Sequence, residues 1–354
     1  MDKSVLKNCK VLGEITDIVI KDGIIEKVGK TDLDGIDMEG KKVYPGLFDI
    51  HCHGYGGYDT MDGDKLAEMS EFLIREGTTS WLPTTMTMDF ETIKKATDTI
   101  PSQDGAEILG FHMEGPYINE KYKGAQNAGF IKNPDIQEYK KLNNIKMVTI
   151  APELEGSIDF IKECDAVVTI GHTDCNYNEA TLAMEAGANC LTHTFNAMPP
   201  LHHREPGPIG AAIDKQAYVQ VISDGIHLHP AIIRTLYRLF GKERMVLISD
   251  CMRAGGLSDG IYEFGGMEMT VKNKVARTDG GALAGSTSTL LECVKKAIEF
   301  GIPEEDAFYM ASATPSNLMK VNKGYIKEGY DADLLVLDDN LNLLNVISGG
   351  KFKF

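Results

Sequence analysis

The chain has 354 residues, of which 43% are hydrophobic, so it can enclose one large core or a large domain with a smaller companion. Its formal net charge of −16 disfavours binding to nucleic acid or to an anionic membrane surface. An anionic substrate would therefore need local positive groups.

Neither membrane insertion nor export is expected. No apolar run reaches the ~20 residues of a membrane span, and the N-terminus has no signal-peptide apolar region. The seven cysteines are scattered without a CxxC pair, which is typical of reduced thiols and not of a disulfide framework. We therefore expect a cytoplasmic protein.

The two ends of the chain read as short strands. Within residues 1–46, the segment 17–29 alternates apolar and polar residues around an Asp-Gly pair at 22–23, which predicts a β-hairpin. The segment 332–338 near the C-terminus is also strand-like. We expect residues 1–46 and 326–354 to pair with each other and build one small β domain.

Residues 47–325 differ, because apolar, β-branched runs alternate there with amphipathic stretches. The expected strands are 47–53, 79–85, 107–114, 147–152, 166–172, 189–195, 217–223 and 245–250. The expected helices are 64–76, 89–100, 135–143, 157–164, 176–186, 230–243, 288–300 and 303–319. Eight strands alternating with helices over ~250 residues predict an α/β fold, a TIM-like (β/α)8 barrel. The segment 261–284 alternates like a β-hairpin insertion, and we expect it to reach toward the small β domain.

The strand expected at 47–53 ends in two histidines. Side chains alternate along a strand, so His51 and His53 share one face about 7 Å apart and can converge on one cation. Two ligands make no site, however, and an isolated pair is more often a pair of ordinary polar residues. The metal interpretation therefore depends on ligands at other strand ends.

The other expected strands supply such ligands. In a barrel, functional side chains stand at the C-terminal ends of the strands. The candidates there are His112, Glu114, His172, His193, His227 and Asp250. Each alone is more often structural, but polar groups repeated around one rim of apolar strands need a partner, which a divalent cation supplies. Nitrogen and carboxylate ligands suit Zn, Fe or Mn.

Such a site indicates hydrolysis. A metal held by His and Glu acidifies water and polarises a substrate carbonyl, while Asp250 could take the proton from the water and pass it to the leaving group. No GxSxG element offers a competing nucleophile. The alternative from another class is a non-catalytic barrel kept for binding, which would be expected to have lost some of these ligands.

Several motifs resemble a known family. The sequence PGLFDIHCHG at 45–54 resembles the first-strand signature of the amidohydrolase superfamily. The motifs FHMEGP, GHT, THTFNAMPPLHHREPG, SDGIH and SDCMRAGG resemble the N-acetylglucosamine-6-phosphate deacetylases in particular, and GYIKEGYDADLLVL at 324–337 also fits. The resemblance implies a metal-dependent barrel with a β-sandwich built from both termini. It also implies hydrolysis of N-acetyl-D-glucosamine 6-phosphate to D-glucosamine 6-phosphate and acetate, with a different amide, such as the galactosamine epimer, as the alternative.

The resemblance assigns metal-binding roles to His51, His53, Glu114, His172, His193 and Asp250. Glu114, His172 and His193 would hold the principal ion, and the two histidines of the first strand would complete a second position. Asp250 would be the catalytic acid and base. Some family members lack the first two histidines and work with one metal, so we expect one or two divalent ions per subunit. Zn or Fe is favoured, with Mn or Co as alternatives.

The resemblance also implies how the phosphorylated amino sugar is held. The residues concerned are Ala125, Gln126, Asn196, Ala197, Arg204 and His227. Asn196 and Ala197 would meet the phosphate, and His227 the sugar or its carbonyl. Arg204 would bind phosphate in the neighbouring subunit's site, which implies a homodimer. Some members carry a histidine at the position of Gln126, which leaves the role of that residue open.

Overall fold

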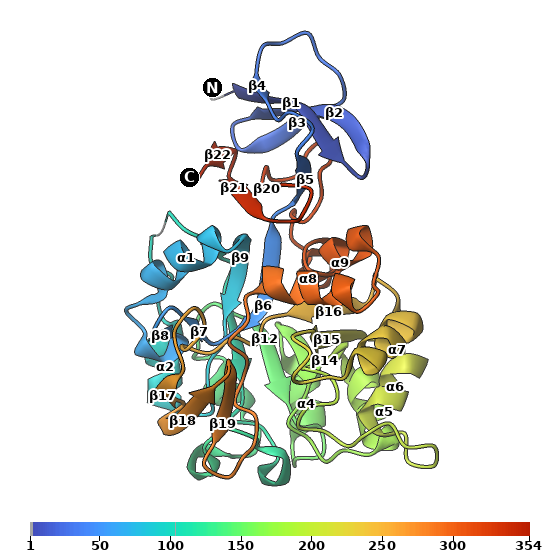
Figure 1. Cartoon of the computed structure of the whole chain (residues 1–354). Coiled ribbons are helices and arrows are strands. Elements are labelled where there is room, and N and C mark those ends of the chain that lie inside the picture. The colour runs from blue at the N-terminus through green and yellow to red at the C-terminus, as the bar shows by residue number, and fades with distance from the viewer. Residues whose placement is uncertain (1–2, 103) are drawn as a thin grey trace.

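Strands from both ends of the chain form one sheet. The computed structural model describes residues 3–102 and 104–354, and it orders this sheet β22-β21-β20-β5-β1-β2-β3, with β4 also against β1. The strands are β1 (Lys3–Val11), β2 (Glu14–Lys21), β3 (Ile24–Val28), β4 (Ile36–Asp37), β5 (Lys42–Pro45), β20 (Leu334–Leu337), β21 (Leu343–Ser348) and β22 (Lys351–Phe352). The C-terminal β20 pairs antiparallel with the N-terminal β5, as expected from the sequence (Figure 1).

The hairpin expected at 17–29 is present. Asp22 and Gly23 connect β2 to β3, and both have positive φ angles, 50° and 82°. Two consecutive positive φ angles give the turn a twist that matches the flanking strands.

Each of the eight apolar runs contains a parallel strand. The strands are β6 (Leu47–Cys52), β9 (Thr78–Pro83), β11 (Phe111–Glu114), β12 (Ile145–Ile150), β13 (Val167–Ile170), β14 (Cys190–Leu191), β15 (Tyr218–Ile222) and β16 (Met245–Ile248). Strands β11 to β16 form one parallel sheet, and β6 and β9 form another with β10 (Glu107–Ile108). Isolated parallel bridges join Thr84 to His112 and Cys52 to Cys251, so the two sheets meet at both edges. The carboxyl ends of all eight strands therefore face the same way.

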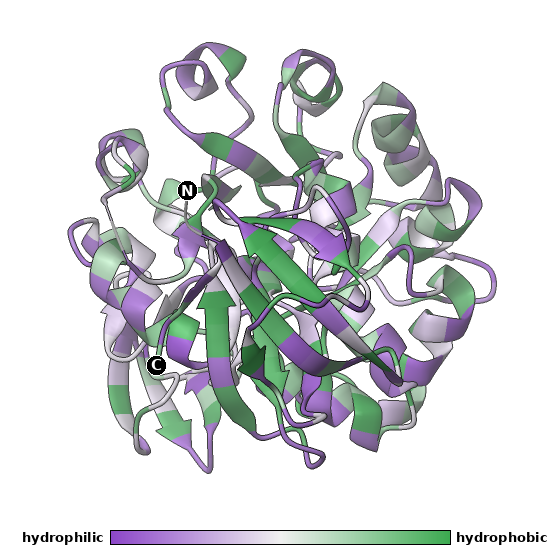
Figure 2. Cartoon of the chain, turned by 90° about the horizontal axis from the view of Figure 1, so that it is seen from above, coloured by the Kyte–Doolittle hydropathy of each residue, from purple (hydrophilic) through white to green (hydrophobic). Residues whose placement is uncertain are grey.

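Helices cover the outside of these strands. The helices α1 (Leu66–Arg75), α2 (Phe90–Thr97), α4 (Ser157–Glu163), α5 (Tyr177–Ala186), α7 (Pro230–Phe240) and α8 (Leu290–Glu299) lie within the expected stretches. Seen from above, they surround the strands and carry hydrophobic and hydrophilic residues together (Figure 2). Their apolar faces pack inward; those of α1, for example, are Leu66, Met69 and Leu73.

Three helix predictions differ from the structure. The stretch 135–143 contains a single turn, α3 (Ile136–Tyr139). The stretch 303–319 forms two helices, α9 (Glu304–Met310) and α10 (Ala313–Met319), because the ring of Pro315 would clash with the carbonyl of Ala311 in one continuous helix. Helix α6 (Gly207–Asp214) was not expected, since its buried small residues show no amphipathic pattern.

The insertion lies elsewhere than expected. It forms an antiparallel sheet of β17 (Gly260–Phe264), β18 (Met267–Lys272) and β19 (Val275–Thr278). The expectation that it reaches toward the terminal sheet was wrong, because the two lie at opposite ends of the molecule (Figure 1). Its apolar face, which includes Phe264 and Met269, packs on Met86 and Met252 beyond the carboxyl ends of the strands.

Short elements complete the path. They are β7 (Gly54–Tyr55), β8 (Tyr58–Asp59), and the 3-10 turns η1 (Thr60–Asp62), η2 (Glu120–Tyr122) and η3 (Ala128–Phe130). All seven cysteines fall within the described residues and are free thiols. Within residues 3–102 and 104–354, no helix combines the length and apolar character needed to cross a membrane.

A buried lysine ties the terminal sheet to the strand and helix layers. Lys323 is 7% exposed, and its Nζ lies 2.7 Å from Glu107, 2.9 Å from Asp331 and 2.7 Å from Asp333. Glu107 belongs to β10, whereas the two aspartates directly precede β20 of the terminal sheet. Burial lowers the pKa of Lys323, but the three carboxylates outweigh that effect and raise it. The lysine is therefore charged and fixes how the two parts dock.

Replacing this lysine should destabilise the protein. Lys323→Met leaves three carboxylates close together without a cation, and we expect a loss of about 3 kcal/mol in the free energy of unfolding. Urea denaturation measures it. The matched control is Lys94→Met, which removes an exposed pair with Asp98 in α2 and should cost about 0.5 kcal/mol or less. Equal stability of the two variants would show that Lys323 is not needed for docking.

Candidate metal centre

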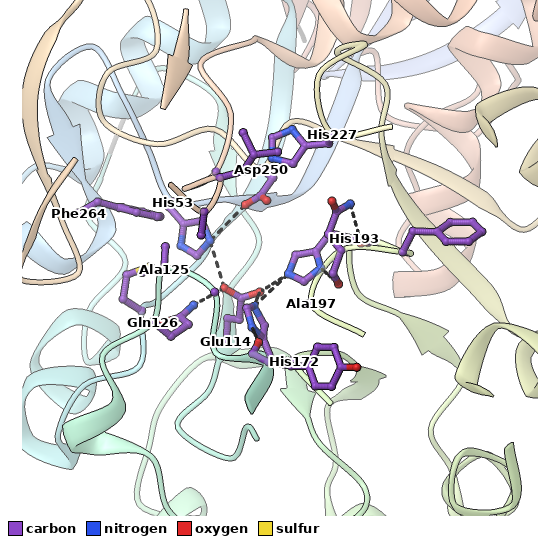
Figure 3. A pocket seen from close by; sticks show the side chains of 18 of the residues that line it. His53, Glu114, Ala125, Gln126, His172, His193, Ala197, His227, Asp250 and Phe264 are labelled. Carbon is purple, nitrogen blue, oxygen red and sulfur yellow. Dashed lines mark hydrogen bonds and ion pairs between the residues drawn. The ribbon is translucent and has the colours of Figure 1, made fainter. Parts of the chain in front are cut away.

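Six side chains expected at strand ends come together in the structure. His51 and Glu114 lie on β6 and β11, and the others follow the strands by one or two residues. Their potential ligand atoms form two groups, each within 4.8 Å: His51, His53 and Asp250 in one, and Glu114, His172 and His193 in the other. All six residues are buried. In Figure 3 the side chains of His53, Glu114, His172, His193 and Asp250 point toward one another.

Glu114 connects the two groups. Its Oε1 lies 3.1 Å from His193 Nε2, 3.3 Å from His172 Nε2 and 3.4 Å from His51 Nε2. Its Oε2 lies 3.3 Å from His53 Nε2. The Oδ1 atom of Asp250 is 3.4 Å from the Nε2 atoms of both His51 and His53.

The four histidines present the same nitrogen to the centre. In each ring the outer Nδ1 is held by an oxygen: His51 by Gln220 Oε1 at 3.0 Å, His53 by Thr84 O at 3.1 Å, His172 by Tyr122 O at 2.8 Å and His193 by Asn196 O at 3.2 Å. A carbonyl oxygen only accepts, so Nδ1 carries the hydrogen and Nε2 turns a lone pair inward.

This donor set fits a divalent metal ion. The Nε2 atoms of His172 and His193 are 3.1 Å apart, and those of His51 and His53 are 3.2 Å apart. Lone pairs this close repel each other unless a proton or a cation lies between them. Imidazole nitrogens with carboxylate oxygens are ligands that Zn, Fe and related ions accept.

The protonation of the clustered side chains also favours a cation at the centre. Burial raises the pKa of Asp250, but His51 and His53 outweigh it and lower the pKa to about 2. Burial lowers the pKa of His53, but hydrogen bonds with Asp250 and Glu114 raise it to about 10. The carboxylates are thus anionic and draw positive charge into the centre, where a proton on His53 takes the place that a metal ion would fill.

The backbone is strained where it delivers these side chains. His172, His193 and Asp250 have φ angles of 47°, 26° and 48°, and Phe195 and Ala197 are also positive at 76° and 51°. Residues other than glycine rarely adopt such angles, which cost on the order of 1–3 kcal/mol each and cluster at functional sites. The strain turns the chain sharply after each strand and aims the side chains at the centre.

A cavity of about 420 Å³ opens onto the ligand cluster. Of the expected substrate-binding residues, it is lined by Ala125, Gln126, Asn196, Ala197 and His227. Arg204 is not among the lining residues of its own chain; it is exposed, with Nη1 2.7 Å from His203 Nε2. His112 stays outside the ligand groups, because its ring is held by Ile50 O and Thr149 Oγ1 and packs against His51.

Gln126 acts on Glu114 directly. Its side chain is buried, and its Nε2 donates a 2.6 Å hydrogen bond to Glu114 Oε2. The Thr87 backbone N–H donates to Gln126 Oε1 at 2.7 Å, which fixes the orientation of the amide. Gln126 therefore orients Glu114, a candidate metal ligand, from the edge of the cavity.

Several functional residues were not expected from the sequence. Asp224 Oδ2 lies 2.7 Å from His227 Nδ1, and its Oδ1 accepts the backbone N–H groups of Ile226 and His227. Its position three residues before His227 in SDGIH was the available signal. Gln220, inside β15, and Phe264, on the insertion, gave none, because their contacts with His51 and His53 join distant segments.

Known proteins are similar to this chain over most of its length. The amidohydrolase family matches residues 43–353. N-acetylglucosamine-6-phosphate deacetylases from Lysinibacillus sphaericus and Bacillus subtilis are 34% and 37% identical, covering 96% and 88% of this chain and 94% and 84% of theirs. The chain belongs to this deacetylase family of amidohydrolases. An N-acetylgalactosamine-6-phosphate deacetylase from Escherichia coli is 35% identical, with 92% of each chain covered.

Solved structures of this deacetylase family have the same fold. A variant of the N-acetyl-D-glucosamine-6-phosphate deacetylase from Mycobacterium smegmatis, in complex with N-acetyl-D-glucosamine-6-phosphate, matches with a TM-score of 0.92 and 29% identity over 99% of both chains. The Thermotoga maritima deacetylase matches with a TM-score of 0.91 and 32% identity, also over 99% of both chains. The amidohydrolase fold is therefore shared from end to end.

The role of Gln126 in this deacetylase is testable. Gln126→Ala removes the donor to Glu114 Oε2, and we expect a ~10–100-fold loss of affinity for Zn²⁺, because groups that orient a metal ligand contribute that much. Competition with a chelator measures the affinity. Gln126→His keeps a ring N–H in the same loop and should lose less. Unchanged affinity in Gln126→Ala would mean that Glu114 needs no orienting partner.

Proposed function

We propose that this amidohydrolase removes the acetyl group from N-acetyl-D-glucosamine 6-phosphate, releasing D-glucosamine 6-phosphate and acetate. The observation that carries the proposal is the set of six candidate ligand side chains, Glu114 and the five around it. They lie at a cavity that is also lined by Asn196, Ala197 and His227. The relatives that match this chain over most of their length are named N-acetylglucosamine-6-phosphate deacetylases.

The proposed cofactor is a divalent metal, with Zn or Fe favoured and Mn or Co as alternatives. Glu114, His172 and His193 would hold one ion, and His51, His53 and Asp250 would complete a second position, giving one or two per subunit. Such an ion polarises an amide carbonyl and makes water acidic enough to attack near neutral pH.

Asp250 is the proposed acid and base. The neighbouring histidines lower its pKa to about 2 against the effect of burial, so the carboxylate is ionised near neutral pH. In this form it can act as the base toward the attacking water. The water oxygen bonds to the acetyl carbon, the C–N bond breaks, and Asp250 passes the proton to the departing amine. His227 is held at Nδ1 by Asp224, which leaves Nε2 to hydrogen-bond the substrate in the cavity.

The chain has a net charge of −16, so binding of the substrate phosphate needs hydrogen-bond donors or positive charge close to it. Backbone N–H groups near Asn196 and Ala197 are proposed to meet it, and Arg204 is proposed to come from a neighbouring subunit of a homodimer. Arg204 is exposed and away from its own cavity, which supports this second role. Bidentate pairing of a guanidinium with phosphate would supply the positive charge.

The proposal extends to architecture and location. The bridges at both edges of the two parallel sheets support one closed (β/α)8 barrel over residues 47–325. The shared sheet of the termini supports a β-sandwich domain from residues 1–46 and 326–354. The seven free thiols support a cytoplasmic protein.

The second candidate substrate is N-acetyl-D-galactosamine 6-phosphate. The galactosamine-specific relative from Escherichia coli is as similar to this chain as the glucosamine-specific ones. The two sugars differ only at one hydroxyl group, and a site built to hydrogen-bond that group rejects the other epimer. Acetate release from both sugars, side by side, decides between them.

Asp250→Asn tests the acid and base. The variant keeps the size of the side chain but cannot carry the proton, so we expect kcat to fall about 10²–10⁴-fold. Acetate release is measured together with bound metal and the unfolding midpoint. Near-normal turnover in a folded, metal-containing variant would end the proposed role of Asp250.

A mixed dimer tests the origin of Arg204. Arg204→Ala and Asp250→Asn should each be nearly inactive alone. In a heterodimer, the Arg204→Ala subunit keeps Asp250 and receives Arg204 from its partner. Co-expression with random pairing should therefore restore roughly a quarter of wild-type activity, as expected for a two-fold symmetric interface.

If co-expression restores no activity, Arg204 does not act in the active site of the neighbouring subunit.

Unphosphorylated N-acetylglucosamine is the companion substrate in the same assay. A wild-type enzyme that hydrolyses it as fast as the phosphorylated sugar would show that no phosphate contact matters.

A further inference from the structure

The cavity has an apolar end and a polar end. Its lining includes the apolar side chains of Met86, Ala125 and Phe264, which belong to one hydrophobic cluster, and it also includes Asn196, Ala197 and His227. In Figure 3, Phe264 and Ala125 lie on one side of Glu114, with His193 and Ala197 on the other. The ligand cluster therefore separates a hydrophobic pocket from the surface proposed to hold the sugar phosphate.

The apolar end is packed tightly. The Phe264 ring meets the His53 ring edge-on, with centroids 5.1 Å apart and an interplanar angle of 83°. Phe264 and Met86 are 2% and 1% exposed and belong with Ala125 to one hydrophobic cluster. Gly265 lets the insertion approach, since a Cβ there would stand 2.8 Å from Met86 Cε. This wall has little room to move.

The position of the reacting carbonyl orients the substrate between these ends. The amide carbon must lie at the ligand cluster, within reach of Asp250. With the amino sugar placed at Asn196 and Ala197, as proposed above, the acyl substituent on the other side of that carbon would point toward Ala125 and Phe264. A methyl group matches that surface, because apolar contacts there replace water.

We propose that Met86, Ala125 and Phe264 form the acyl subsite, and that the inserted sheet β17–β19 limits the substrate to a two-carbon acyl group. The proposal rests on the deacetylase function and adds which part of the chain selects the acyl chain. Phe264 is a specificity-determining residue in this view and takes no part in proton transfer. The insertion thereby acquires a function as one wall of the site.

A series of acyl lengths tests the subsite. The substrates are the N-acetyl, N-propionyl and N-butyryl forms of glucosamine 6-phosphate, and kcat/KM is measured from the release of glucosamine 6-phosphate. We expect each added methylene to lower wild-type kcat/KM about 10-fold or more, in line with selection by an apolar pocket. Phe264→Ala and Met86→Ala should each raise the propionyl-to-acetyl ratio about 10-fold.

Two controls separate the subsite from general damage. Ile261→Ala changes an exposed residue on the same strand, β17, and should leave both rates and their ratio unchanged. Phe195→Ala changes a ring that lines the cavity next to Asn196, and it should affect all acyl lengths alike. Met86 lies outside the insertion, so its variant reports on the subsite even if Phe264→Ala unfolds the inserted sheet.

The outcomes are distinct. A wild-type enzyme with no activity on the N-acetyl substrate would refute the proposed function itself. Normal wild-type activity with an unchanged propionyl-to-acetyl ratio in folded Met86→Ala and Phe264→Ala would refute the acyl subsite alone. A raised ratio in Phe195→Ala but not in Phe264→Ala would place the acyl group at the opposite end of the cavity.

Discussion

Four imidazole rings and two carboxylates meet in a buried space, and this concentration of polar atoms constrains the rest of the structure. Glu114 lies within 3.4 Å of the Nε2 atoms of His51, His172 and His193. Unpaired polar groups in such surroundings would cost several kcal/mol each, so the arrangement persists only with a cation or proton among them. Positive charge at this centre is thus a requirement of the packing, and a metal ion there is the proposed source of the chemistry.

The surrounding chain positions these side chains at three levels of structure. Parallel strands bring their ends to one rim, strained residues turn the side chains inward, and oxygens of Thr84, Tyr122, Asn196 and Gln220 hold the outer ring nitrogens. Gln126 does the same for Glu114. Five of the six candidate ligands are therefore oriented by the chain itself, which would lower the reorganisation that binding of an ion requires.

The inserted sheet and the terminal sheet pack at opposite ends of the molecule and have different structural roles. The insertion covers the carboxyl ends of the strands and brings Phe264 against His53, so it closes the apolar side of the cavity. The terminal sheet lies at the opposite end and is held there by Lys323 among three carboxylates (Figure 1). The candidate metal centre and the docking of the terminal sheet thus use separate charged clusters.

The sequence by itself predicted the eight strands, most helices, strands at both ends of the chain and six candidate ligands. These follow from local periodicity and from residue types at strand ends. Only the tertiary structure decided where the insertion packs, that Gln126 bonds Glu114, and that Asp224 holds His227. It also decided the break between α9 and α10. Periodicity records which face of an element is buried, whereas the partner of that face depends on contacts between segments far apart in the chain, which no local pattern encodes.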